Sequence, residues 1–255
     1  MKITFLGTGT SSGVPVIGCD CAVCNSKDPK NKRTRPSILI CHNDRNILID
    51  TATDLREQAL RNKITHIDAI LCTHVHADHV FGMDDIRPFN YIQNGAIPYY
   101  AVKKDIKELK DIFHHIFEPV PQEGGGTPRI DLKELDPKKP LYLYGLEIIP
   151  IDIMHGIVPI LGFRIGKFAY LTDCSEIPED SFKKLEGLDV VVLDALRHKP
   201  HPTHFNVEQA VKTAEKIGAE QTFFTHIAHN LDHEKTNKEL PKNMKLAYDG
   251  LEIEL

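Results

Sequence analysis

The sequence predicts an α/β protein in which β-sheets are covered by helices. Both halves of the 255-residue chain are rich in short apolar segments typical of strands, and amphipathic helical segments interrupt them. No Gly/Ser-rich linker, internal repeat or low-complexity segment divides the chain. We therefore expect a single domain over residues 1–255.

Apolar runs bounded by turn residues predict the strands. The expected strands are residues 1–6, 37–50, 67–72, 141–154, 162–166, 168–172, 189–195 and 221–225. The segment 37–50 predicts two short strands, because its Asn-Asp-Arg-Asn sequence is typical of a hairpin turn. Helices are expected at residues 53–61, 103–118, 178–185 and 207–217. Polar stretches at residues 7–36 and 119–132 predict long loops.

Composition and charge exclude several classes of function. The chain has 31 basic and 36 acidic residues, a net charge of -5, and therefore no extended surface for nonspecific nucleic-acid binding. Its first residues turn polar at Gly7, unlike a signal peptide, and no apolar run approaches the roughly 18 residues of a membrane span. The six cysteines are spaced unlike a disulfide framework. We expect a cytoplasmic protein with no membrane association, and leave its oligomeric state open, a homodimer included.

The segment CTHVHADHVFG, residues 72–82, contains several residues of the types that bind metal ions. In an extended segment, residues two apart point the same way, so His74 and His76 can bind one ion. Asp78 and His79 can face a second ion. Imidazoles combined with carboxylates suit zinc, iron or manganese. The spacing therefore predicts a metal site.

Further ligand-type residues follow predicted strands. His155, Asp173 and His226 each come directly after one. If these strands run the same way, their carboxyl ends meet at one edge of the fold and bring the side chains together. Asp173 has two carboxylate oxygens, so it can bridge two ions.

The string His-x-His-x-Asp-His, followed along the chain by MHG, LTDCS and FTH, resembles the metallo-β-lactamase superfamily. The resemblance covers essentially the whole chain and implies an αββα sandwich. It places His74, His76 and His155 on a first metal ion, Asp78, His79 and His226 on a second, and Asp173 between the two. Members that carry out redox chemistry at iron tend to have a carboxylate at the position of His76. The histidine here favours hydrolysis.

A second set of ligands lies in the loop at residues 7–36. Cys19, Cys21 and Cys24 are poorly spaced for disulfides and suit a structural zinc ion, which needs a fourth ligand. The candidates for that ligand are His229, His42 and Cys41. We favour His229, because it lies three residues after His226 whereas the other two belong to the predicted hairpin.

The cysteine loop, together with THVHADHVFGMDDIRPF, GGTPRIDL and ALRHKPHPTHFN, resembles one branch of this superfamily. That branch contains cyclic-phosphate phosphodiesterases of the PhnP type, with ribonuclease Z as a more distant relative. The resemblance implies two divalent ions (manganese, zinc or iron) in the active site, a structural zinc, and hydrolysis of a small phosphodiester such as a cyclic ribose or nucleotide phosphate. Asp78 would orient the attacking hydroxide. A histidine of the HPTH motif would protonate the leaving group, with His204 as the match and His201 as the alternative.

Other functions stay open at this stage. An accessory or biosynthetic protein resembling pyrroloquinoline quinone biosynthesis protein B shares the cysteine loop, although the complete ligand set argues against a degenerate binder. Thioester and lactam hydrolases use the same metals but do not usually carry that loop. Arg87 and Arg197 are candidate phosphate contacts, as are the backbone amides of the glycine-rich segment GTGTSSG.

Overall fold

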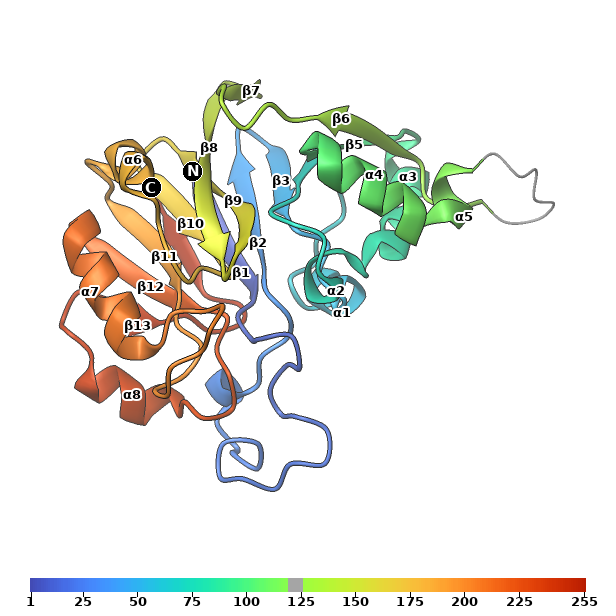
Figure 1. Cartoon of the computed structure of the whole chain (residues 1–255). Helices are drawn as coiled ribbons and strands as arrows, with labels where there is room; N and C mark the ends of the chain where they lie inside the picture. The colour runs from blue at the N-terminus through green and yellow to red at the C-terminus, as the bar shows by residue number, and fades with distance from the viewer. Residues whose placement is uncertain (119–125) are drawn as a thin grey trace.

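A computed structural model describes residues 1–118 and 126–255. Two seven-stranded sheets lie face to face, and helices cover their outer faces (Figure 1). This arrangement confirms the αββα sandwich. Residues 119–125 of the predicted loop 119–132 lie outside the described residues.

The first sheet has the strand order β14-β1-β2-β3-β4-β5-β6. Its strands are β1 (Lys2–Gly7), β2 (Ser37–His42), β3 (Arg45–Ile49), β4 (Ala69–Leu71), β5 (Ile97–Ala101), β6 (Ile130–Glu134) and β14 (Glu252–Glu254). Strands β2 and β3 form the predicted hairpin, whose turn residues Asn43 and Asp44 have φ angles of 49° and 57°. Strands β3 to β6 are parallel, so their carboxyl ends share one edge.

The second sheet has the order β13-β12-β11-β10-β9-β8-β7. Its strands are β7 (Leu141–Leu143), β8 (Leu146–His155), β9 (Val158–Ile165), β10 (Phe168–Leu171), β11 (Val190–Asp194), β12 (Gln221–Thr225) and β13 (Met244–Leu246). Strand β9 is antiparallel to both β8 and β10, and β10 to β13 are parallel. Strands β8, β10, β11 and β12 therefore end at the same edge.

Helices pack on the outside of both sheets. They are α1 (Leu55–Arg61), α2 (Ala77–Val80), α3 (Arg87–Gln93), α4 (Lys103–Ile112), α5 (His114–Phe117), α6 (Glu179–Phe182), α7 (Val207–Ile217) and α8 (His233–Glu239), with 3-10 turns at Pro29–Asn31, Met83–Ile86 and Lys183–Leu185. Helix α7 has the predicted bounds because Asn206 and Gln209 form a capping box at its start and Gly218 ends it at φ 72°. Within the described ranges, no helix combines the length and apolarity needed to cross a membrane.

Apolar side chains alternate along the strands to form the core between the sheets. Phe5 of β1 and Phe223 of β12 meet across that interface with ring centroids 5.7 Å apart, and both are buried. Separate clusters lie between each sheet and its outer helices: Ala210 and Ala214 pack α7 onto the second sheet, and Leu55 packs α1 onto the first. Each sheet is thus covered on two faces and is held as a rigid platform for the loops at its edge.

Two predicted elements differ in the structure. Residues 141–154 form a hairpin, β7 and β8, rather than one strand, because Tyr144 and Gly145 turn the chain at φ angles of 52° and 84°. Tyrosine is not typical of that turn position, so the sequence carried no clear turn signal. The helix predicted at 103–118 breaks at Phe113, whose side chain is buried in the core beneath the first sheet's helices.

The close approach of β9 to β10 gives a stability prediction. A Cβ atom at Gly162 would lie 2.8 Å from the Tyr170 carbonyl oxygen and would overlap the Leu171 side chain. Gly162→Ala should therefore lower the free energy of unfolding by about 1–3 kcal/mol in a urea titration. Gly95→Ala is the matched control, because its nearest atom is the Gln93 carbonyl oxygen at 3.8 Å, and it should stay within about 0.5 kcal/mol. Equal stability of the two variants would contradict this packing argument.

Candidate metal centre

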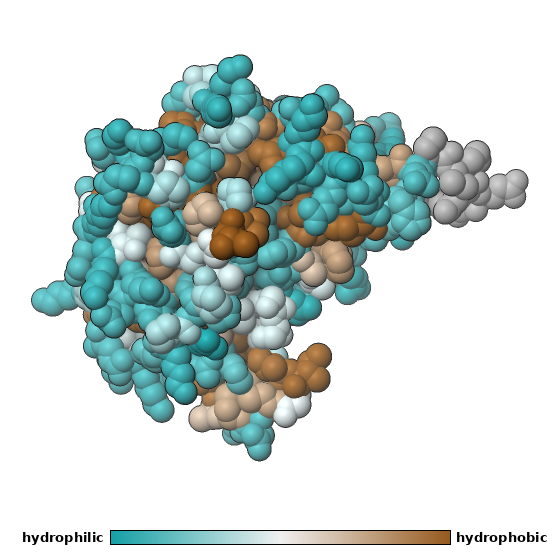
Figure 2. Space-filling model, in the orientation of Figure 1, coloured by the Kyte–Doolittle hydropathy of each residue, from teal (hydrophilic) through white to brown (hydrophobic). Residues whose placement is uncertain are grey.

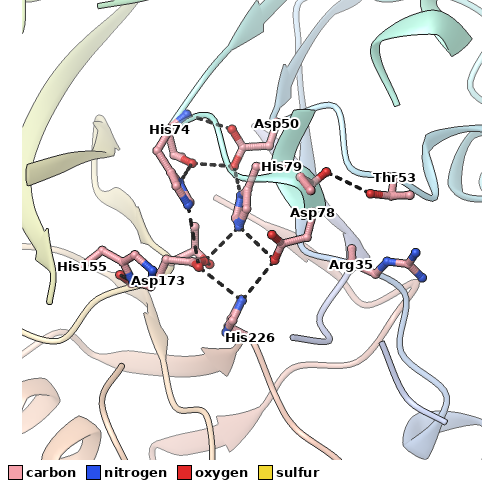
Figure 3. Close-up of polar contacts among 12 residues, drawn as sticks. Arg35, Asp50, Thr53, His74, Asp78, His79, His155, Asp173 and His226 are labelled. Carbon is pink, nitrogen blue, oxygen red and sulfur yellow. Dashed lines mark hydrogen bonds and ion pairs between the residues drawn. The ribbon is translucent and has the colours of Figure 1, made fainter. Parts of the chain in front are cut away.

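The predicted metal ligands converge at the edge where the strands end. His74 and His76 follow β4, His155 ends β8, and Asp173 and His226 follow β10 and β12. We call this set the histidine–aspartate cluster: His74, His76, Asp78, His79, His155, Asp173 and His226. Figure 3 shows most of its side chains pointing toward Asp173. The shared strand direction assumed from the sequence is what brings them together.

Asp173 lies at the centre of the cluster. Its Oδ1 is 3.1 Å from His79 Nε2, and its Oδ2 is 3.3 Å from His226 Nε2 and 3.9 Å from His74 Nε2 (Figure 3). Asp78 Oδ2 lies 3.5 Å from the Nε2 atoms of both His79 and His226. One carboxylate thus faces both predicted metal positions, as a bridging ligand must.

The ligand atoms form overlapping sets. Within each set all ligand atoms lie within 4.8 Å of one another, and the sets are Asp78–His79–Asp173–His226, His74–His76–Asp173, His155–Asp173–His204 and Asp194–His204–His226. Asp173 belongs to the first three of these four sets. The structure sets His155 beside His76, with ring centroids 5.0 Å apart, and also beside His204, with centroids 4.6 Å apart.

Several of these atoms are buried without a hydrogen-bond partner. They are His74 Nε2, Asp78 Oδ2, His79 Nε2 and His226 Nε2. Leaving buried polar atoms unpaired destabilises a protein, and buried unpaired groups of this kind need an explanation. Divalent cations satisfy imidazole nitrogens and carboxylate oxygens together, so the residues present fit a two-ion site.

Polar contacts outside the cluster fix the orientation of its rings. Asp50, at the end of β3, accepts hydrogen bonds from the Thr73 amide at 2.8 Å and from His79 Nδ1 at 2.7 Å. His155 Nδ1 lies 3.0 Å from the Asp173 carbonyl oxygen and 2.9 Å from that of Thr203. With Nδ1 engaged, the Nε2 atom of each ring is left to face a metal ion.

Burial and the charges of neighbouring side chains shift the pKa values of the cluster's residues in opposite directions. Burial alone would raise the pKa of Asp173, but His226 and His79 hold it well below its usual range. Burial lowers the pKa of His74, whereas the carboxylate of Asp173 raises the pKa of His226 to about 9 against the effect of burial. Protons and metal ions therefore compete for the same ring nitrogens.

Three residues at the strand ends of the site have a strained backbone conformation. Asp50, Asp173 and His226 adopt φ angles of 64°, 56° and 59°, a left-handed conformation that non-glycine residues rarely take. Such strain concentrates at functional sites, where the surrounding structure enforces it. It turns each side chain inward directly after its strand.

His204 lies beside the cluster and is paired with Asp194. Its Nδ1 is 2.7 Å from Asp194 Oδ2, and Asp194 is completely buried at the end of β11. Burial, and next the charge of His226, lower the pKa of His204 to about 3, while burial raises the pKa of Asp194. A ring nitrogen of His204 also lies within 4.8 Å of ligand atoms of Asp173 and His155.

The cysteine loop forms a second cluster, which we call the cysteine cluster: Cys19, Cys21, Cys24 and His229. The three sulfur atoms lie 3.2, 3.6 and 3.5 Å from His229 Nδ1, and all four ligand atoms fall within 4.8 Å of one another. The Cys24 amide donates to Cys21 Sγ and lowers the pKa of Cys21 to about 6. The structure thus places His229, not His42 or Cys41 of β2, with the three cysteines, and the set suits a tetrahedral zinc ion.

Other side chains singled out in the sequence lie elsewhere. Arg87 donates to the Gly126 carbonyl oxygen at 3.3 Å, and Arg197 donates to the carbonyl oxygens of Lys199 and Pro200. Neither contacts the histidine–aspartate cluster among the described residues. His201 Nδ1 accepts from the Thr203 amide at 3.3 Å. Asp50 and Asp194 were missed, although each directly follows an apolar run, ILI and VVVL, in the same way as the predicted ligands.

Comparison with known proteins establishes the family. Residues 45–227, more than half of the chain, match the model of the Beta-lactamase superfamily domain. The chain therefore belongs to that superfamily and has the metallo-β-lactamase fold, as the strand-end ligands indicated. The predicted family is confirmed.

Individual relatives show which members of the superfamily this chain is similar to. A solved structure described as a new diphosphatase from the PhnP family is 47% identical, covers 100% of this chain and 96% of its own, and has a TM-score of 0.93. Zn²⁺-bound PqqB from Methylobacterium extorquens has a TM-score of 0.82 over 100% of both chains at 19% identity, which shows the shared fold. An octanoyltransferase of Porphyromonas gingivalis is 39% identical over 99% of this chain but only 51% of its own length. This chain thus spans about half of that relative.

The cysteine cluster predicts a zinc-dependent stability. Cys21→Ser should remove about one zinc ion per chain, because it breaks the ligand set, and should lower the melting temperature by about 5–10 °C. Elemental analysis and thermal unfolding measure the two effects. Cys41→Ser is the matched control, since Cys41 is half-buried in β2 outside the cluster. A Cys21→Ser protein with full zinc content and an unchanged melting temperature would disprove the assignment.

Proposed function

We propose that this chain is a metal-dependent phosphodiesterase that hydrolyses a small phosphodiester or diphosphate. The observation that carries the proposal is the histidine beside the metal ligands: a ring nitrogen of His204 lies within 4.8 Å of ligand atoms of His155 and Asp173. A two-ion site with an adjacent proton donor suits cleavage of a P–O bond whose leaving group needs a proton. The likeness to a PhnP-family diphosphatase at 47% identity supports this choice.

The residues divide into two ligand sets. His74, His76 and His155 would hold one ion, and Asp78, His79 and His226 the other, with Asp173 shared. When bound, two divalent ions of manganese, zinc or iron supply a nucleophile at neutral pH and offset the negative charge on phosphate. Asp78 faces both His79 and His226 and would orient the attacking hydroxide. Asp50 keeps the His79 ring fixed while this happens.

His204 is the residue best placed to protonate the leaving oxygen. Asp194 holds its Nδ1, so the opposite nitrogen would face the leaving oxygen. A negatively charged substrate close to the ring favours its protonated form. His201 is less suited, because its ring lies nearer the surface and, among the described residues, it is not grouped with the ligand atoms of the cluster.

Two alternative functions can be distinguished from the proposed one by experiment. The relative described as an octanoyltransferase makes an acyl substrate worth testing, and the fold shared with PqqB makes a non-hydrolytic role worth testing. Purified protein should hydrolyse bis(p-nitrophenyl) phosphate at least tenfold faster than octanoyl-coenzyme A or a β-lactam. Faster cleavage of the thioester would replace the proposal with a thioesterase. Absence of all three activities with metals bound would favour an accessory role.

The octanoyltransferase relative also suggests a metabolic setting. Its extra half, which this chain does not match, is joined to a segment 39% identical to this chain. We propose that this chain associates with an octanoyltransferase and acts in the same reaction sequence. Co-expression with an octanoyltransferase, followed by co-purification, tests the association, and absence of a complex at micromolar concentrations would contradict it.

Leaving-group chemistry tests the assignment of His204. An alkoxide needs a proton to depart, whereas p-nitrophenolate leaves without one. His204→Ala should therefore slow hydrolysis of a cyclic ribose phosphodiester by about a hundredfold or more, and of a p-nitrophenyl ester much less. His201→Ala should have a smaller effect on both. Equal losses on both substrates would make His204 a positioning residue, and loss of a metal ion would make it a ligand.

A further inference from the structure

A cavity of about 790 Å³ is lined by residues of both sheets. Its walls come from the end of β5, the start of α4 and the residues after β6 on one side, and from β8 and β9 on the other. Figure 2 shows apolar side chains on this face of the molecule, between β8 and α4 of Figure 1, with hydrophilic side chains around them. The volume lies within the roughly 300–1,000 Å³ of pockets that hold a whole small molecule.

Apolar side chains form much of the wall of this cavity. They are Val102, Leu135, Pro137, Pro159, Ile160 and Leu161. The Leu161 amide donates to the carbonyl oxygen of the buried Thr73 at 3.1 Å, so the two sheets meet where these residues line the cavity. Thr73 precedes the ligand His74, yet no residue of the histidine–aspartate cluster is among the described residues that line the cavity. The cavity is therefore distinct from the set of metal ligands.

One buried carboxylate lines the cavity without a close partner. Asp105, in the first turn of α4, is 3% exposed, and within the described part of the chain no group donates a hydrogen bond to its side chain. Lys104 Nζ lies 4.0 Å from Asp105 Oδ1 and donates instead to the Pro159 carbonyl oxygen at 2.9 Å. Burial raises the pKa of Asp105 to about 6, so the carboxylate is still ionised at neutral pH.

The other charges of the wall offset one another. Three acidic and three basic side chains line the cavity and are exposed: Glu134, Asp136, Asp152, Lys103, Lys104 and Lys138. Asp105 therefore remains as the buried charge that needs a counter-ion.

The surroundings of Asp105 favour an organic cation over a metal ion. Metal sites in proteins are built from several ligand atoms, and within the described ranges Asp105 belongs to no group of ligand side chains. A protonated amine brings one positive charge and up to three N–H donors, which a single carboxylate can accept. The carbon body of such a molecule can cover the apolar wall.

We propose that this cavity binds a small organic amine, whose ammonium group pairs with Asp105 and whose apolar body packs against the wall. Lys104 competes for the same carboxylate and therefore limits the affinity. The bound amine would lie against Thr73, whose Oγ1 is 2.8 Å from Asp50 Oδ2 and 3.0 Å from His74 Nδ1. Binding there does not depend on the proposed phosphodiesterase function.

Isothermal titration with simple amines tests the site on the metal-loaded protein at neutral pH. Hexylamine should bind roughly tenfold or more tightly than 1-hexanol, because only the amine pairs with the buried carboxylate. It should also bind more tightly than methylamine, which carries the charge but cannot cover the apolar wall. Equal binding of hexylamine and 1-hexanol, or of hexylamine and methylamine, overturns the proposal.

Two variants with opposite expected effects locate the amine. Asp105→Asn should weaken hexylamine binding roughly tenfold to hundredfold and abolish the preference over 1-hexanol. Asp111→Asn, an exposed position of the same helix outside the cavity, is the control and should retain it. Lys104→Gln removes the competing cation, so it should strengthen hexylamine binding.

A preference for hexylamine that persists in Asp105→Asn would place the amine elsewhere, on the metal ions included, and overturns the proposal. If Asp105→Asn is unfolded, Lys104→Gln decides, because unchanged or weaker hexylamine binding in that variant also overturns it.

Discussion

The structure depends on a concentration of buried charge at one edge of the sandwich. Asp50, Asp173 and Asp194 are buried at the ends of β3, β10 and β11, and imidazole rings surround them. Buried charges are costly unless they are paired, and several nitrogens and oxygens here have no partner in the protein. Cations that bind these atoms stabilise the folded chain by mass action. The buried groups that destabilise this edge when they are unpaired are also the groups that can bind two metal ions.

The N-terminal loop connects the two clusters. It pairs with Ile227 beside the histidine–aspartate cluster, and its cysteines meet His229 two residues further along the same segment. A zinc ion held there would fix the loop against the strand end that carries His226. The cysteine cluster and the histidine–aspartate cluster therefore share one short stretch of backbone, and loosening the loop should disturb both.

The sequence predicted the fold and the ligand positions where a strong periodic or spacing signal existed. Asp173 and His226 were found because each follows an apolar strand and fits a recognised order of ligands. Asp50 and Asp194 follow strands in the same way, yet a lone aspartate after a strand looks like any turn residue. The break at Phe113 and the turn at Tyr144 arise from tertiary packing and uncommon backbone angles, which local propensity does not report.

The central claim is that Asp173 is shared by two metal ions. Elemental analysis of the purified protein tests it most directly, with Asp173→Asn as the variant because asparagine tolerates the left-handed φ of 56° at this position. The account predicts two divalent ions per chain in addition to the zinc of the cysteine cluster, and loss of one or both of those two in Asp173→Asn while the zinc stays bound. A variant with an undiminished metal content would contradict it, as would a wild-type protein that holds a single ion besides that zinc.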